Sequence, residues 1–180
     1  MLKSADESKT QLTELMIPTY ANFGGKIHGG QILSLLDKAA YVCASKHADN
    51  YCVTLSVDRV EFLHPVEVGT LLHLLASVNY VGRTSLIVGV KVLSENFKTK
   101  SVVHTNSCYF TMVSVDSEGK PSKVPGLILK NELELRRFVE GRNRKLMNLK
   151  FKQEFEESRK ELTERLNGVD LSSENCEIRL

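Results

Sequence analysis

The sequence predicts an α+β domain in which one helix packs against an antiparallel sheet. Apolar residues follow a helical period over residues 30–47 and cover so much of that helix that other structure must surround it. Four later segments, between residues 52 and 116, alternate apolar and polar residues or are rich in β-branched and aromatic ones, as strands are. The connections between these segments are short, which favours antiparallel neighbours because parallel strands need long crossovers.

The N-terminal part is predicted to contain one strand and the helix. Residues 1–11 are polar and are expected to be frayed, and residues 12–21 are predicted as a short strand ending at Pro18. Four glycines follow within residues 24–30, directly before the helix. The sequence therefore places much backbone freedom immediately ahead of its most apolar element.

The sheet is predicted from residue 52 onward. Residues 52–63 alternate and then change phase, which predicts a bulge near Asp58 and Arg59. Residues 70–80, 85–95 and 101–116 are predicted as strands, and residues 116–126 contain the glycine, prolines and serines of a turn that ends the sheet.

The chain changes character after residue 126, which predicts a domain over residues 1–126 and a helical extension over residues 127–180. The extension is rich in Glu, Lys, Arg and Leu, and it is predicted as one or two long surface helices with a possible break at Gly141. Its basic cluster at 141–145 is interpreted as a solvated helix face, with an anion contact as the alternative. Its apolar residues are expected to pack on the domain or on a neighbouring subunit: Phe138, Leu146, Met147, Phe151 and Phe155.

Composition excludes several function classes. With 42% hydrophobic and 26% charged residues, the 180-residue chain can form a core, and its net charge of +2 does not indicate a nucleic-acid partner. No apolar stretch is long enough to span a bilayer, and the N-terminus lacks the apolar segment of a signal peptide. The four cysteines are scattered and the five histidines lack metal-ligand spacing. We therefore expect a cytoplasmic protein with reduced thiols, of which two or three fill the core, and with no metal and no membrane span.

One carboxylate and one helix end are the candidate chemical groups. Asp37 lies at the edge of the apolar arc, where partial burial is expected to raise its pKa unless hydrogen-bond donors compensate. Residues 27–30 include no Ser, Thr, Asp or Asn, so the first N–H groups of the helix are expected to lack a side-chain cap. Gly29 and Gly30 would let an anion or a polarised carbonyl approach those N–H groups. The alternative is a tight turn before the helix and a solvated acid within it.

Helix geometry separates these two groups. Asp37 is about two turns, some 10 Å, from the helix start, which is far for one carboxylate to act on a carbonyl held at the same end. A second copy of the helix, from another protomer, could bring an Asp closer.

Five segments carry a family resemblance. They are NFGGKIHGG (22–30), LLDKAA (35–40), VTLSVDRVEFLHPVEVG (53–69), VNYVGRTSL (78–86) and YFTMVSVDSEGKPSKVP (109–125). In order and spacing they resemble the acyl-CoA thioesterases of the hotdog fold, in the branch of bacterial short-chain and brain-type acyl-CoA hydrolases. The resemblance covers about residues 15–126.

The resemblance implies hydrolysis of fatty acyl-CoA to a free acid and CoA, with no cofactor beyond the substrate itself. It implies a hotdog fold, an antiparallel sheet wrapped around one long helix, and homodimers that often assemble as trimers of dimers. It also implies a catalytic pair, Asn22 and Asp37, that lies at the dimer interface. Arg83, Thr84 and Ser85 correspond to a segment that contacts CoA.

The chemistry of these residues and the family resemblance together suggest a mechanism as a hypothesis. The N–H groups near Gly29 and Gly30 would stabilise the oxyanion, Asp37 would act as general base or nucleophile, and Asn22 would orient the water or the thioester. His28 lies inside the glycine loop, where it is expected to pack or cap, or to contact substrate.

Two other functions stay open. An acyl-CoA-binding regulator on the same fold would not hydrolyse its ligand, although the presence of both Asn22 and Asp37 argues against it. A hydratase would use an Asp/His pair, for which His28 and Asp37 are the candidates. The chain also departs from the family pattern at Phe23, Gly24–Gly25 and His64, and in the segment beyond Val124, which leaves chain-length preference and regulation open.

Overall fold

A computed structural model describes the chain except residues 59, 166–172, 178 and 180. The chain forms two compact units, Met1–Gly141 and Arg142–Leu180. The predicted boundary after residue 126 stays a prediction. Among the described residues, no helix combines the length and the apolar character needed to cross a bilayer.

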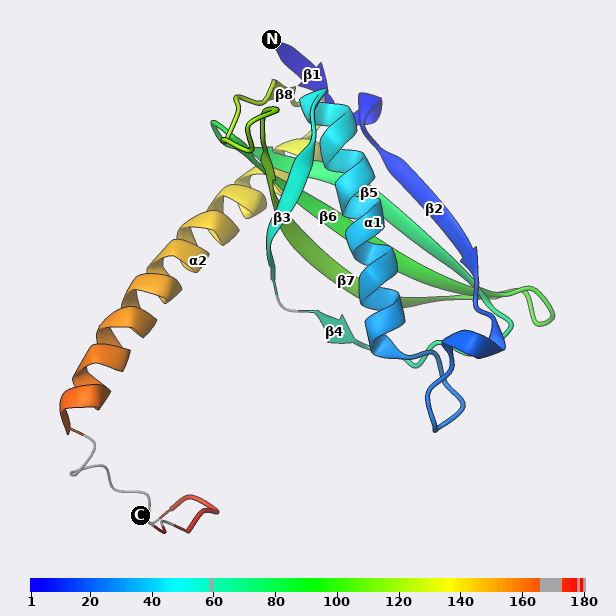
Figure 1. Cartoon of the computed structure of the whole chain (residues 1–180). Coiled ribbons are helices and arrows are strands. Elements are labelled where there is room, and N and C mark those ends of the chain that lie inside the picture. The colour runs from blue at the N-terminus through cyan, green and yellow to red at the C-terminus, as the bar shows by residue number, and fades with distance from the viewer. Residues whose placement is uncertain (59, 166–172, 178, 180) are drawn as a thin grey trace. The chain divides into compact units, whose positions relative to one another are not determined.

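The first unit is built on a curved antiparallel sheet with helix α1 (Gly29–Ala48) lying across one face (Figure 1). The strand order is β2-β5-β6-β7-β3, and β4 pairs with β7 beside β3. The strands are β2 (Thr10–Leu15), β3 (Cys52–Val57), β4 (Glu61–Phe62), β5 (Leu71–Val81), β6 (Ser85–Asn96) and β7 (Ser101–Ser114). The predicted α+β arrangement and the antiparallel pairing are confirmed.

The core lies between α1 and the sheet. The helix presents a stripe of small residues that are fully buried, which lets its backbone approach the strands closely. The stripe consists of Ala39, Ala40, Cys43 and Ala44. Cys43, Cys52 and Cys108 are buried free thiols, as expected of core residues, and burial raises the pKa of Cys43 and Cys108 to about 12. These thiols are therefore protonated and unreactive at neutral pH.

The expectation that residues 1–11 are frayed is wrong. Strand β1 (Leu2–Ser4) pairs in parallel with β8 (Gly126–Ile128), a 3-10 turn η1 (Ala5–Glu7) follows, and β2 already begins at Thr10. The predicted strand over 12–21 is thus shifted, since residues 18–20 form the 3-10 turn η2 (Pro18–Tyr20). The pairing partner of β1 is more than a hundred residues away, so a local pattern carries no sign of it.

The predicted strand over 52–63 is two strands, β3 and β4. A register shift lies between Thr54 and Ser56 in the pairing of β3 with β7. The bulge was expected near Asp58 and Arg59, and Arg59 lies outside the described residues. The observed irregularity is therefore a few residues earlier, within β3 itself.

Helix α2 (Glu132–Arg165) continues through Gly141, so the expected break there is wrong. A Cβ atom at position 141 would lie 2.6 Å from the Cβ of Tyr80, which explains the glycine by close packing on β5. Phe138 contributes to the same contact, with its ring 5.0 Å from that of Tyr80. Within the second unit the apolar residues expected to pack are exposed: Leu146, Met147, Phe151 and Phe155. The last twelve residues, 169–180, are predicted from their sequence as a tail, and half of them lie outside the described residues.

His47 generates a prediction about pH. Its side chain is buried at the end of α1, and its Nε2–H donates to the carbonyl oxygen of Pro125 at 3.2 Å. Burial lowers the pKa of His47 below its ordinary value of 6.5. Below that value the unfolded chain binds a proton that the folded chain does not, so stability is lost as the pH falls.

We expect the melting temperature of the chain to fall between about pH 7.5 and pH 5, and His47→Gln to make this fall shallower. His104→Gln, at an exposed histidine of β7, is the control and should keep the wild-type slope. Equal slopes for His47→Gln and wild type, measured by circular dichroism, would show that His47 does not cause the pH dependence.

Candidate functional site

The loop before α1 is folded around Asn22. The side-chain Oδ1 of Asn22 accepts hydrogen bonds from the N–H groups of Gly24 (2.9 Å) and Lys26 (3.2 Å). Gly25 has a φ of 75°, a conformation that glycine adopts without strain. The oxygen of the Asn22 side chain is used to hold the turn. Because Asn22 is exposed, its NH₂ group remains accessible to a molecule outside the loop.

The helix start is capped, contrary to expectation. His28 Nδ1 accepts from the Gly30 N–H at 2.9 Å, because an imidazole nitrogen can replace the hydroxyl or carboxylate oxygens that cap most helices. The Gly29 N–H, one position earlier, donates to no acceptor among the described residues. The available donor at this helix end is therefore the amide of Gly29 rather than the amides of both glycines.

Asp37 lies on the outer side of α1 and is exposed in the single chain, so the expected partial burial is wrong for one copy. Its carboxylate has a specific partner: Thr54 Oγ1–H donates to Asp37 Oδ1 at 2.6 Å. This bond fixes the carboxylate against β3.

No role for Thr54 was predicted from the sequence. A signal existed in the alternation of β3, since Thr54 is two positions after buried Cys52 and therefore points to the same, helix-facing side. A hydroxyl on the helix-facing side of a strand beside the only carboxylate of an apolar helix is a candidate partner for that carboxylate.

The remaining predicted residues lie at the other end of the molecule. Arg83 and Thr84 lie in the turn between β5 and β6, and Ser85 begins β6. The N-terminus of α1 is held near the opposite end of β5 through the hydrogen bond from the Ile27 N–H to the Val66 carbonyl oxygen. An 11-residue strand spans about 36 Å. Within one chain the structure brings Asn22, His28 and Gly29 together and leaves Arg83 far away, with a side chain that is exposed and has no partner among the described residues.

An apolar surface surrounds Asp37. Strand β3 ends the sheet, so one of its backbone edges has no strand partner in the part of the chain that the structure describes. Its side chains Leu55 and Val57 are 69% and 45% exposed. Leu33 and Tyr41, one turn to either side of Asp37 on α1, are exposed as well. An unpaired, apolar edge strand beside an apolar helix face is a site for pairing with another chain.

No metal chemistry is indicated by the side chains in the part of the chain that the structure describes. There, no three His, Cys, Asp or Glu side chains come together as ligands. What the site offers is one free amide donor, one hydrogen-bonded carboxylate and one exposed asparagine amide.

Comparison with known sequences identifies relatives. Residues 24–99 match the thioesterase superfamily. The chain is 51% identical over 146 residues to the protein VdlD of Helicobacter pylori, covering 81% of this chain and 83% of VdlD. It is 33% identical over 129 residues to YkhA of Bacillus subtilis, described as an uncharacterized acyl-CoA thioester hydrolase, covering 72% of this chain and 75% of YkhA.

Solved structures agree in fold. An acyl-CoA hydrolase of Staphylococcus aureus, solved with butyryl-CoA, CoA and CoA disulfide, superposes with a TM-score of 0.81 at 29% identity over 91% of this chain and 99% of that one. An apo-hexameric acyl-CoA thioesterase superposes with a TM-score of 0.80 at 37% identity over 83% of this chain and 96% of its own.

Three variants of the S. aureus hydrolase bear on the site. Each replaces one residue by alanine: an asparagine, an aspartate or a threonine. The three residues follow one another along that chain at the same intervals as Asn22, Asp37 and Thr54 here.

The capping bond of His28 can be tested by stability. His28→Ala is expected to destabilise the chain by about 1 kcal/mol in urea denaturation, because the Gly30 N–H loses its acceptor. His28→Asn, which retains a capping oxygen, is the matched control and should stay close to wild type. Equal stability of the alanine variant and the wild type would show that the cap is unimportant and would favour the substrate contact for His28.

Proposed function

The chain belongs to the acyl-CoA thioesterases of the thioesterase superfamily and has their hotdog fold, and we propose that it hydrolyses fatty acyl-CoA in sites shared by two copies of the chain. The products are a free fatty acid and CoA. The observation that carries the proposal is the bond from Thr54 to Asp37 on an uncovered apolar face, about 12 Å by helix rise from the free Gly29 N–H.

A second copy would complete the site. Pairing of β3 with β3 of a partner satisfies both open edges, and packing of the two α1 helices covers Leu33, Tyr41 and Leu55. In such a two-fold pair the helices run in opposite directions, so Asp37 of one copy approaches the Asn22 and Gly29 end of the other. The Arg83 turn approaches the same end, where its guanidinium can bind a phosphate of CoA and Thr84 and Ser85 can add hydroxyl donors. The hexameric relatives support further assembly of such dimers.

The residues act in order on the thioester. The Gly29 N–H points at the thioester carbonyl oxygen and stabilises the negative charge that develops there, with a smaller contribution from Gly30 because His28 engages its N–H. Asp37 removes a proton from water, and the resulting hydroxide attacks the carbonyl carbon. The tetrahedral intermediate collapses by breaking the C–S bond, and the CoA thiolate leaves and takes up a proton. The NH₂ of Asn22 orients the thioester or the water.

The same carboxylate could instead attack the carbonyl carbon directly, so that the C–S bond breaks, the CoA thiolate leaves and an acyl-aspartyl anhydride forms, which water then opens at the aspartyl carbonyl. Isotopic water separates the two routes in a single turnover with enzyme in excess. If Asp37 acts as a general base, the first fatty acid released contains ¹⁸O from the solvent. If Asp37 acts as the nucleophile, the first fatty acid contains an unlabelled oxygen from the Asp37 carboxylate.

Asp37→Asn is expected to lower kcat by about 10²–10⁴-fold, because the amide can neither take a proton from water nor attack. Thr54→Val should lower kcat about tenfold by removing the hydroxyl that positions the carboxylate, and Thr54→Ser should restore it. The assay is release of CoA thiol across a series of acyl chain lengths. A wild-type chain that binds acyl-CoA without releasing thiol would establish the alternative, a non-hydrolytic acyl-CoA-binding regulator.

The shared site predicts complementation between two inactive chains. Co-expressed Asn22→Ala and Asp37→Asn chains with different tags form mixed dimers, each with one site that contains both native residues. A random mixture should reach about a quarter of wild-type activity, because about half of the dimers are mixed and one of their two sites is intact. Mixed dimers as inactive as either parent would place Asn22 and Asp37 of one site in the same chain.

A further inference from the structure

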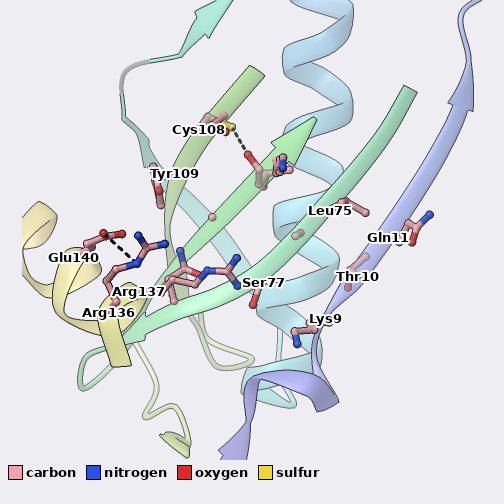
Figure 2. A pocket seen from close by; sticks show the side chains of 16 residues that line it. Lys9, Thr10, Gln11, Leu75, Ser77, Cys108, Tyr109, Arg136, Arg137 and Glu140 are labelled. Atoms are coloured by element: carbon pink, nitrogen blue, oxygen red, sulfur yellow. Dashed lines mark hydrogen bonds and ion pairs between the residues drawn. The ribbon is translucent and has the colours of Figure 1, made fainter. Parts of the chain in front are cut away.

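A cavity of about 520 Å³ lies on the face of the sheet opposite α1. On β5, Leu72, Leu74, Ala76 and Val78 face the helix, so Leu75 and Ser77 point to the other side. Figure 2 shows Arg136, Arg137 and Glu140 of α2 on one side of the cavity and Lys9 on the other. All of these residues belong to the first compact unit. The cavity plays no part in the proposed thioester chemistry.

The floor of the cavity contains a buried amide without a partner. Asn79 is only 7% exposed and lines the cavity, yet among the described residues its side chain makes no hydrogen bond. The amide lines the cavity with no partner in the described part of the chain, so both of its N–H groups and its oxygen are available to a molecule bound there.

The backbone is shaped to direct this amide into the cavity. Asn79 follows Leu75 and Ser77 in the alternation of β5 and therefore points to the same outer face, and it is also the extra residue of a bulge, since Val78 pairs with Val88 and Tyr80 with Ile87. Gly89 makes room for it, since a Cβ atom there would lie 2.6 Å from Asn79 Nδ2 and 3.2 Å from Tyr109. The alternation of β5 and the glycine of β6 thus place this side chain against the cavity.

The charges around this amide are mainly positive. Glu140 ion-pairs with Arg136 and Asp6 with Lys9, which leaves Lys91 and half-buried Arg137 without an acidic partner in the described part of the chain. Two free cations beside an amide that donates two N–H groups suit a doubly charged anion. The volume exceeds that of a single phosphate, and Leu75 and Tyr109 supply apolar surface for an attached organic group.

We propose that this cavity, lined by Asn79, Lys91 and Arg137, is a second binding site that takes a small phosphate-bearing molecule. The phosphate accepts from the Asn79 amide and from both cations. The ligand binds on the side of the sheet away from Asp37, so it occupies a site separate from that of the thioester.

Two probes test the site by isothermal titration calorimetry at low ionic strength. Inorganic pyrophosphate presents the charge alone, and phenyl phosphate adds a ring that can lie against Leu75 and Tyr109. Tighter binding of phenyl phosphate would identify an organic phosphate ester as the natural class, and tighter binding of pyrophosphate would identify a diphosphate. Absence of heat from both probes at millimolar concentration would overturn the proposal.

Variants locate the binding. Lys91→Gln combined with Arg137→Gln should weaken the preferred probe at least about tenfold, since each removes a charge-assisted hydrogen bond. Lys98→Gln combined with Lys100→Gln removes two positive charges from the exposed β6–β7 turn and should bind like wild type. Asn79→Ala should also weaken binding while leaving the melting temperature unchanged or higher. Equal weakening by the Lys98/Lys100 control would show non-specific attraction only and would refute the site.

Thioester hydrolysis is measured on the same variants without phosphate. It should be unchanged in the Lys91/Arg137 variant, because neither residue lies on the α1 side of the sheet. A wild-type chain that does not hydrolyse acyl-CoA would refute the proposed function and leave the phosphate titration interpretable.

Discussion

The close approach of α1 to the sheet is the constraint on which the rest of the structure depends. Ala39, Ala40, Cys43 and Ala44 remove side-chain bulk between helix and strands, so the helix backbone lies close to the sheet. This proximity lets the short side chain of Thr54 reach Asp37 from β3. A larger residue in the stripe would raise the helix from the sheet, and the site would lose this bond before the fold lost its core.

Much of the fold followed from local pattern, because helix and strand periods are written in consecutive residues. The helix over 30–47 and the strands over 70–80, 85–95 and 101–116 are found within a few residues of their predicted places. Two of the errors have the same physical origin, which is a contact between residues distant in the chain. The first residues form strand β1 because β8 pairs with them. Gly141 lies inside α2 and does not end it, and the close approach of Tyr80 explains why this position has no side chain. In the candidate site, the helical pattern predicted Asp37 and the family resemblance predicted Asn22, whereas the Thr54 partner required three-dimensional proximity. The His28 cap is local, two residues from Gly30, and was missed because an imidazole is not among the usual capping side chains.

The two faces of the sheet show how one strand can serve two environments. β5 alternates buried and half-buried side chains from Leu71 to Val78, with the buried set against α1. Val78 and Asn79 are both buried although they face opposite sides of the sheet, and a bulge follows in the pairing with β6. Gly89 on β6 and the first turns of α2 complete the space around it. A local irregularity on the outer face is thus compatible with an uninterrupted core on the inner face.

The uncovered edge at β3 connects stability with chemistry. A single chain exposes Leu55 and Val57 beside an open strand edge, which is an aggregation hazard unless another chain covers it. The same single chain holds its free amide and its carboxylate too far apart to act on one carbonyl. The proposed two-fold pairing at β3 would solve both problems, because it would cover the edge and place the carboxylate of one copy at the helix start of the other. Folding, assembly and activity are then properties of the pair, and a substitution that weakens the β3 edge should lower activity even where it touches no reacting atom.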